Sequence, residues 1–130
     1  MTPIEWVRDG ERVLAILIPA VYAPVRTEFI TPDSYNQQVG FIVYPPGGAV
    51  APHRHRELER VIRGTGEVLV VRSGRCEVDF YDAAGACLAT RALGPGDVIV
   101  LVSGGHGFRM QEQTVLLEIK QGPYPGRSEK

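Results

Sequence analysis

Residues 47–74 read GGAVAPHRHRELERVIRGTGEVLVVRSG, and this stretch is the most informative part of the sequence for predicting the fold and the chemistry of the chain. The stretch holds His53 and His55, two of the three histidines among the 130 residues. On an extended strand alternate side chains share a face, so the two imidazoles are expected to project the same way and to reach one metal ion. Neutral imidazole binds Fe, Mn, Co, Ni, Cu and Zn, and a carboxylate often completes the ligand set. The stretch therefore predicts a metal site with an acidic residue nearby.

On both sides of this stretch, short apolar runs alternate with turns. The chain has 15 glycines and 10 prolines, dispersed along its length, and it carries no sustained helical apolar stripe. The runs predicted as strands are residues 13–18, 27–31, 39–44, 67–72, 75–82, 87–93, 98–102, 108–110 and 114–120, in addition to the histidine strand itself. Because residues 39–44 are apolar on both faces, we expect them in the middle of a sandwich. Many short strands joined by turns predict an all-β antiparallel sandwich or barrel.

Two turns are predicted to close β-hairpins. Ser73-Gly74 is a two-residue spacer of the hairpin type, and residues 83–86 turn the chain again before the next strand. In the second hairpin we expect Cys76 to lie opposite Leu93 and not opposite Cys87. The sequence therefore predicts two free thiols, with Cys76 in the core.

Two motifs resemble those of the cupin superfamily. The first cupin motif is Gly-x5-His-x-His-x3,4-Glu-x6-Gly, and the matching residues are Gly47, His53, His55, Glu59 and Gly66. The second motif joins Gly-Asp, an apolar strand, a turn and a histidine. Gly96-Asp97, residues 98–105 and His106 match it, although the turn lacks the usual proline.

The resemblance covers residues 38–120 and implies a jelly-roll β-barrel. On this basis residues 1–130 form a single cupin domain with a core barrel at about 38–120. Residues 4–31 are then expected as edge strands or as a dimer contact, because small cupins commonly form homodimers. The resemblance also implies that His53, His55, His106 and one glutamate bind the metal ion.

Two glutamates compete for the acidic position. Glu59 fits the motif spacing, whereas Glu67 also stands six residues before a glycine. If Glu67 begins an inward-facing set, Leu69 and Val71 share its face and the strand has an apolar inner side. If Glu59 begins the set, Arg63 points inward, where an unpaired charge is costly unless it meets an anionic substrate. The expected ligands are His53, His55, Glu67 and His106, with Glu59 as the alternative to Glu67.

Composition narrows the range of partners. The chain has 14 lysine and arginine residues and 15 acidic residues, so it lacks the excess of positive charge that would indicate nucleic-acid binding. No apolar run is long enough to span a bilayer, and we expect a soluble cytoplasmic protein that binds a small molecule. The arginines at 54, 56, 60 and 63 are interpreted as a solvated face, or alternatively as a clamp for a carboxylate or phosphate. The aromatic side chains of Tyr44, Phe80, Tyr81 and Phe108 are expected to pack within the sandwich.

Three histidines and one glutamate leave positions open on an octahedral ion. The hypothesis is a metal-dependent enzyme acting on a small polar substrate, as a dioxygenase with Fe or as an isomerase or lyase with Mn, Ni, Co or Zn. Because no dedicated general base accompanies the ligands, catalysis itself stays open. The alternative from another class is a non-catalytic metal- and sugar-binding module, an accessory in polysaccharide biosynthesis. A metal-free cupin of the sugar-epimerase kind is a third interpretation.

Overall fold

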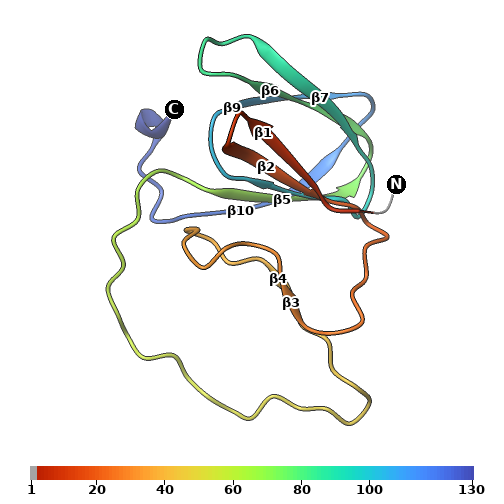
Figure 1. The fold of residues 1–130 in the computed structure, drawn as a ribbon, viewed down its shortest axis with the longest axis vertical. Helices are drawn as coiled ribbons and strands as arrows, with labels where there is room; N and C mark the ends of the chain where they lie inside the picture. The colour runs from red at the N-terminus through yellow and green to blue at the C-terminus, as the bar shows by residue number, and fades with distance from the viewer. Residues whose placement is uncertain (1–2) are drawn as a thin grey trace. The chain divides into compact units, whose positions relative to one another are not determined.

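The structure is a computed structural model that describes residues 3–130. The described elements are β1 (Glu5–Asp9), β2 (Arg12–Ile18), β3 (Glu28–Phe29), β4 (Gly40–Phe41), β5 (Glu67–Ser73), β6 (Cys76–Tyr81), β7 (Cys87–Leu93), β8 (Val98–Leu101), β9 (Gly105–Met110), β10 (Val115–Lys120) and the short 3-10 helix η1 (Arg127–Glu129) (Figure 1). Every strand pair is antiparallel. The predicted all-β antiparallel class is therefore confirmed.

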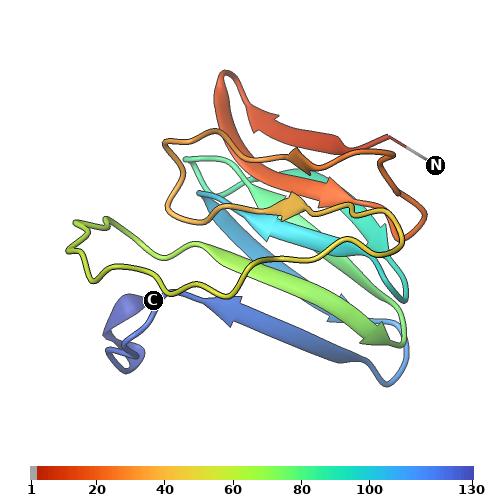
Figure 2. The ribbon, with the colours of Figure 1, turned by 90° about the horizontal axis from the view of Figure 1, so that it is seen from below.

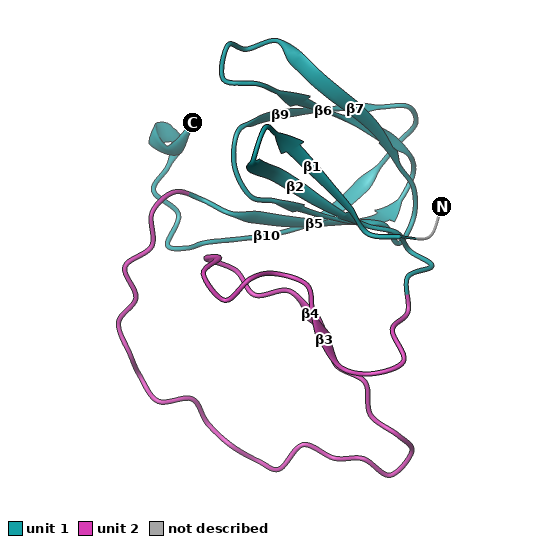
Figure 3. Ribbon diagram, in the orientation of Figure 1, with its two compact units in different colours: residues 1–22, 65–130 teal, residues 23–64 magenta. Residues whose placement is uncertain are grey.

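The chain divides into two compact units (Figure 3). Unit 1 comprises residues 1–22 and 65–130, and unit 2 comprises residues 23–64. Unit 1 contains a five-stranded sheet with the order β1-β2-β8-β5-β10 and a three-stranded sheet with the order β7-β6-β9. The strands of this larger sheet can be followed side by side in Figure 2.

The core of unit 1 lies between these two sheets. Leu14, Leu69 and Ile99 come from the larger sheet and pack in one cluster with Val78 and Phe80 of the smaller sheet. In β5, β6 and β8 alternate residues enter this cluster, as the two-residue period of a strand requires. We call the face that carries the cluster the inner face of each sheet. The hydrophobic effect on these inner faces is what holds the two sheets together.

The register of the second hairpin follows the prediction. Cys76 lies opposite Leu93 in the β6–β7 pair, and both cysteines are free. Cys76 is fully buried, whereas Cys87 is exposed. Phe80 is buried and Phe108 packs partly against the core, as expected of strand aromatics.

The predicted hairpin at Ser73-Gly74 is wrong. β5 pairs with β8 and β10, whereas β6 pairs with β7 and β9, so the turn carries the chain from one sheet to the other. β5 and β6 bury their apolar faces in the shared core from opposite sides, so the chain reversal at Ser73-Gly74 encloses the core without a ladder between these two strands. Gly74 has a φ of 86°, a left-handed conformation that L-residues with a Cβ rarely adopt.

Of the N-terminal strands within residues 4–31, expected as edge strands or as a dimer contact, one lies at a sheet edge and one lies inside the sheet. Residues 13–18 lie in β2, which is an inner strand paired with β1 and β8. β1 has no counterpart among the predicted strands, and it forms one edge of the larger sheet. Val7 of β1 and Leu14 of β2 belong to the core cluster. These strands therefore contribute to the core of unit 1 itself.

Unit 2 has much less regular structure than its sequence predicts. β3 and β4 form a two-residue pair in place of strands at 27–31 and 39–44, and Tyr44 is exposed. Over residues 23–64, Thr31 is the one buried residue. Residues 39–44 are therefore not a central sandwich strand, because their apolar side chains are not enclosed. Residues 49–63, which include the histidine pair, contain no strand.

Candidate metal centre

Glu67 and His106 meet in unit 1, across the gap between the two sheets. Glu67 begins β5 and lies opposite the core residue Leu101 of β8, so its side chain is on the inner face. His106 lies opposite the core residue Phe80 in the β6–β9 pair, and it is also on an inner face. The Nε2 atom of His106 is 3.6 Å from Oε1 of Glu67. The predicted inward direction of Glu67 is confirmed.

Both side chains of this pair are largely enclosed. Their side-chain exposures are 20% for Glu67 and 29% for His106. Leu69 and Val71 follow Glu67 on the same inner face and are buried, whereas Arg72 is exposed, which is the alternation expected for a Glu67-led strand. The sequence places His106 just after a turn. The structure instead includes it in β9, whose pairing with β6 fixes the direction of the imidazole.

His53 and His55 lie together in unit 2. Their ring centroids are 5.2 Å apart at an interplanar angle of 64°, and both residues are exposed. The Nδ1 atom of His53 is 2.9 Å from the carbonyl oxygen of Ala51. Since a carbonyl can only accept, this hydrogen bond requires the proton on Nδ1 and leaves the Nε2 lone pair available to a metal ion. The predicted histidine pair is present, but on irregular backbone and not on a strand.

Each unit thus supplies two of the four predicted ligands. Within neither unit, over the described residues 3–130, do three or more His, Cys, Asp or Glu side chains form a group that could hold a metal ion. Glu59, the alternative carboxylate, is exposed in unit 2. The arginines at 54, 56, 60 and 63 are exposed as well, which agrees with a solvated face.

Two further charged residues, which the sequence interpretation did not assign, share the inner face with Glu67. They are Glu118 and Lys120 of β10, and Lys120 lies opposite Glu67 in the β5–β10 pair. Leu117 and Ile119 alternate with them on the outer face, where they are 44% and 50% exposed. A strand at a sheet edge usually buries its apolar side. The alternation of apolar and charged residues is visible in the sequence, but which side faces the core is not.

Burial and a neighbouring carboxyl group disfavour the charged form of Glu67. The pKa of Glu67 is raised from 4.5 to about 7, first by burial and then by the hydrogen bond and the negative charge of Glu118. The charge of Lys120 acts in the opposite direction on this pKa. For His106, burial lowers the pKa, which favours the neutral imidazole that binds metals. Burial therefore disfavours a charge on both Glu67 and His106, and the carboxyl group of Glu67 is in contact with that of Glu118.

The geometry of Glu67 and His106 suits two ligands of one ion. Ligand atoms at about 2.0–2.2 Å from a metal, separated by bond angles of 90–120°, stand about 3–4 Å apart. The observed separation of 3.6 Å lies within that range and is too long for a hydrogen bond. A cation would also offset the repulsion between Glu67 and Glu118. The donor set of one imidazole and one carboxylate is typical of Zn, Mn and Fe sites.

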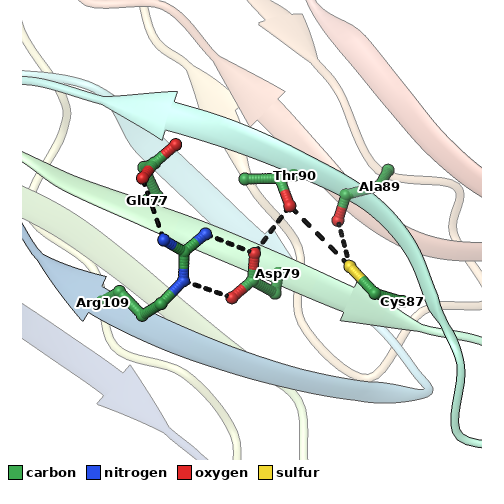
Figure 4. A network of polar contacts seen from close by, with 6 residues as sticks. All are labelled: Glu77, Asp79, Cys87, Ala89, Thr90 and Arg109. Carbon is green, nitrogen blue, oxygen red and sulfur yellow. Dashed lines mark hydrogen bonds and ion pairs between the residues drawn. The ribbon is translucent and has the colours of Figure 1, made fainter.

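A second polar network lies on the outer face of the three-stranded sheet (Figure 4). Arg109 donates to both carboxylate oxygens of Asp79 at 2.8 Å and to Glu77 at 3.1 Å. Thr90 donates to Asp79 at 2.6 Å. The hydrogen bonds from Arg109 and Thr90 lower the pKa of Asp79 to about 2. Through these hydrogen bonds and ion pairs the network joins β6, β7 and β9.

The fold and the site define this chain as an all-β protein with antiparallel sheets and an inward-facing Glu-His pair. Comparison with protein-family models, with curated proteins and with solved structures gives no match. Among the described residues, the structure has no helix with the length and apolar character needed to cross a membrane.

Proposed function

We propose that this chain is a metal-binding protein of the cupin type. Its ligands are His53, His55, Glu67 and His106, and the ion is Fe, Mn, Ni, Co or Zn. The observation that carries the proposal is the approach of Glu67 to His106 at 3.6 Å between the two sheets. An acid and an imidazole that come from distant parts of the sequence and meet beside a hydrophobic core are typical of a functional site.

The choice of Glu67 over Glu59 rests on three features of unit 1. Glu67 is on the inner face, it is largely enclosed, and its carboxylate faces an imidazole. Glu59 is exposed and has none of these features. The hydrogen bond that orients His53 through Nδ1 is the kind that commonly orients metal-binding histidines. His53 and His55 are assigned by the spacing of the sequence motif.

The fold proposed for this function is the jelly roll. Two facing antiparallel sheets in unit 1, with β8 at the centre of the larger one, support it. The cupin resemblance covers residues 38–120, and a single domain over residues 1–130 is proposed with it. A homodimer in solution is proposed with it.

The proposed activity is turnover of a small polar molecule. A bound metal ion would supply a Lewis acid or a site for O2. Of the chain's own residues, Glu118 hydrogen-bonds to Glu67 and offers a carboxyl group that can hold a proton beside the ion. Glu118 thus provides the acid–base group that the sequence motifs leave unassigned.

Metal analysis followed by turnover assays tests this function. The protein is produced without added metal, and its metal content is measured by mass spectrometry. O2 uptake is then recorded with a panel of thiols, diketones and sugars. About one ion per chain with uptake on one class supports an oxygenase. One Zn per chain with no turnover of the panel favours the binding module, whereas a chain that takes up no metal contradicts the proposal.

A further inference from the structure

The C-terminal turn of the chain places a carboxylate beside the Glu67–His106 pair. Glu129 of η1 accepts a hydrogen bond from Nζ of Lys120 at 3.0 Å through one oxygen, and from the hydroxyl of Thr65 at 3.2 Å through the other. The side chain of Glu129 is 11% exposed. Both oxygens of the Glu129 side-chain carboxylate therefore accept hydrogen bonds from groups of unit 1.

The groups that hold Glu129 belong to the candidate site. Lys120 lies directly opposite Glu67 on the inner face, and Thr65 stands two residues before Glu67 in the chain. The charges of Lys120 and Glu129 both act on the pKa of Glu67, in opposite directions. The terminal Lys130 likewise acts on the pKa of His106. Glu129 is thus an electrostatic neighbour of the proposed ligands.

Little else fixes this turn to the sandwich. η1 buries no residue, and its other hydrogen bonds are local, from Ser128 to Pro125 and from Lys130 to Arg127. Lys120 also lies over the ring of Tyr124 at 5.3 Å, yet Tyr124 is 67% exposed. What holds Glu129 is two side-chain hydrogen bonds, on a turn that buries no residue. The contact of Glu129 is therefore weak enough to exchange with another anion.

We propose that Lys120 and Thr65 form a subsite for the carboxylate group of a small ligand, and that Glu129 occupies this subsite when the ligand is absent. The location of that ligand beside Glu67 and His106 rests on the proposed function. The proposed substrate is then a small polar carboxylate. Its charged group binds to Lys120, and the rest of the molecule lies beside the metal centre. This assigns anion binding to Lys120 and not to the exposed arginines of unit 2.

Because Glu129 is part of the same chain, it competes with the ligand at an effective concentration on the order of millimolar. A ligand must displace Glu129 to bind, so removal of the Glu129 charge raises the apparent affinity of the subsite for a free carboxylate. Loss of Lys120 removes the positive charge that attracts the carboxylate. The two substitutions therefore have opposite effects on one measured affinity.

An acetate titration of the metal-free protein, followed by NMR at the amide of Thr65, tests the subsite. The titration is run at pH 6, where the acetate probe is mostly ionised. We expect Glu129→Gln to bind acetate at least about fivefold more tightly than the wild type, in line with the removed intramolecular competitor. Glu112→Gln, which removes an exposed carboxylate from the turn before β10, should bind as the wild type does. The double variant Glu129→Gln with Lys120→Met should lose the response.

Equal acetate affinity in wild type and Glu129→Gln overturns the subsite, as does retained binding without Lys120. A chain in which no variant responds to acetate overturns it equally. Because this titration uses no metal, it separates the two proposals. A positive acetate result in a protein that takes up no ion leaves the subsite standing and rejects the metal centre, and the reverse pattern rejects the subsite alone.

Discussion

Glu67 is an acid in a position that disfavours its charge. In the unfolded chain it releases its proton near the ordinary pKa of 4.5, and in the folded chain near 7. Between these values the folded state holds more protons than the unfolded state, so the stability contributed by this residue falls as the pH rises. The effect belongs to the metal-free protein, since a bound ion would stabilise the carboxylate.

Glu67→Gln should remove that pH dependence. At pH 8, in the presence of a chelator, we expect the melting temperature of the variant to exceed that of the wild type by on the order of 2–4 °C. Below pH 5 the two proteins should melt together, because the wild-type carboxyl group is then neutral. Thermal unfolding followed by circular dichroism measures both values. Glu59→Gln is the matched control, and a Glu67→Gln variant less stable than wild type at pH 8 would contradict the account.

Asp79 has the opposite linkage. Its pKa is lowered from 3.8 to about 2 by Arg109 and Thr90, so the stability it contributes is present above pH 4 and is lost as the pH falls through 2. We expect Asp79→Asn to lower the melting temperature at pH 7 by roughly 5 °C, with a smaller difference at pH 2. Glu77→Gln, which loses a single bond to Arg109, should have a smaller effect. Equal melting temperatures for Asp79→Asn and wild type at pH 7 would show that the network contributes nothing.

The side chains of the candidate site were only partly predictable. The parity of residues 67–72 points Glu67 inward, because the opposite choice buries Arg72. Glu118 and Lys120 are not assigned by the same rule, since β10 turns these two charged residues inward and Leu117 and Ile119 outward. The Asp79 network depends on which strand lies beside β6, and no local pattern contains that pairing.

At the scale of elements, the turn at Gly74 connects the two sheets of unit 1, because β5 before it and β6 after it lie in different sheets. It carries the chain between sheets with a φ of 86°, and a Cβ there would collide with the backbone of Gln113 and with Thr114. Gly85 has the same φ of 86° in the β6–β7 turn, but a Cβ there would meet nothing within 4 Å. A comparison of alanine substitutions at the two glycines therefore distinguishes the free-energy cost of the left-handed backbone conformation from the cost of steric overlap.

Alanine at each glycine should give different losses of stability. Gly85→Ala is expected to cost about 1–2 kcal/mol, the penalty of the left-handed conformation alone. Gly74→Ala should cost about 2–5 kcal/mol, because overpacking adds to that penalty. Urea unfolding measures both free energies. If the Gly74 variant lost no more than the Gly85 variant, the crossing between sheets would not be as tightly packed as the structure shows.

Strand positions in unit 1 follow the sequence more closely than strand partners do. The apolar runs at 67–72, 87–93 and 98–102 coincide with β5, β7 and β8, since alternating or continuous apolar residues locate a buried strand. β1 is missed because Val7 is its one buried residue. The Ser73-Gly74 hairpin fails because a two-residue spacer permits a chain reversal without determining whether the strands pair or face each other.

At the scale of the whole molecule, the division of the chain into two units could not be predicted from the sequence. Unit 1 has a continuous core from both sheets, whereas Thr31 is the one buried residue between 23 and 64. The short β3–β4 pair of unit 2 is accompanied by side-chain hydrogen bonds, such as that of Thr31 with the amide of Val39. Metal binding by His53 and His55 would give this otherwise exposed segment an energetic reason for a fixed conformation.

The metal content of two glutamate variants tests the central claim most directly. Wild type, Glu67→Gln and Glu59→Gln are purified without added metal and analysed by mass spectrometry, with circular dichroism to verify that each is folded. We predict about one ion per chain in the wild type and in Glu59→Gln, and a loss of at least about tenfold in metal affinity for Glu67→Gln, as expected when a ligand is removed. Metal retained in full by Glu67→Gln, or no metal in the folded wild type, would contradict the account.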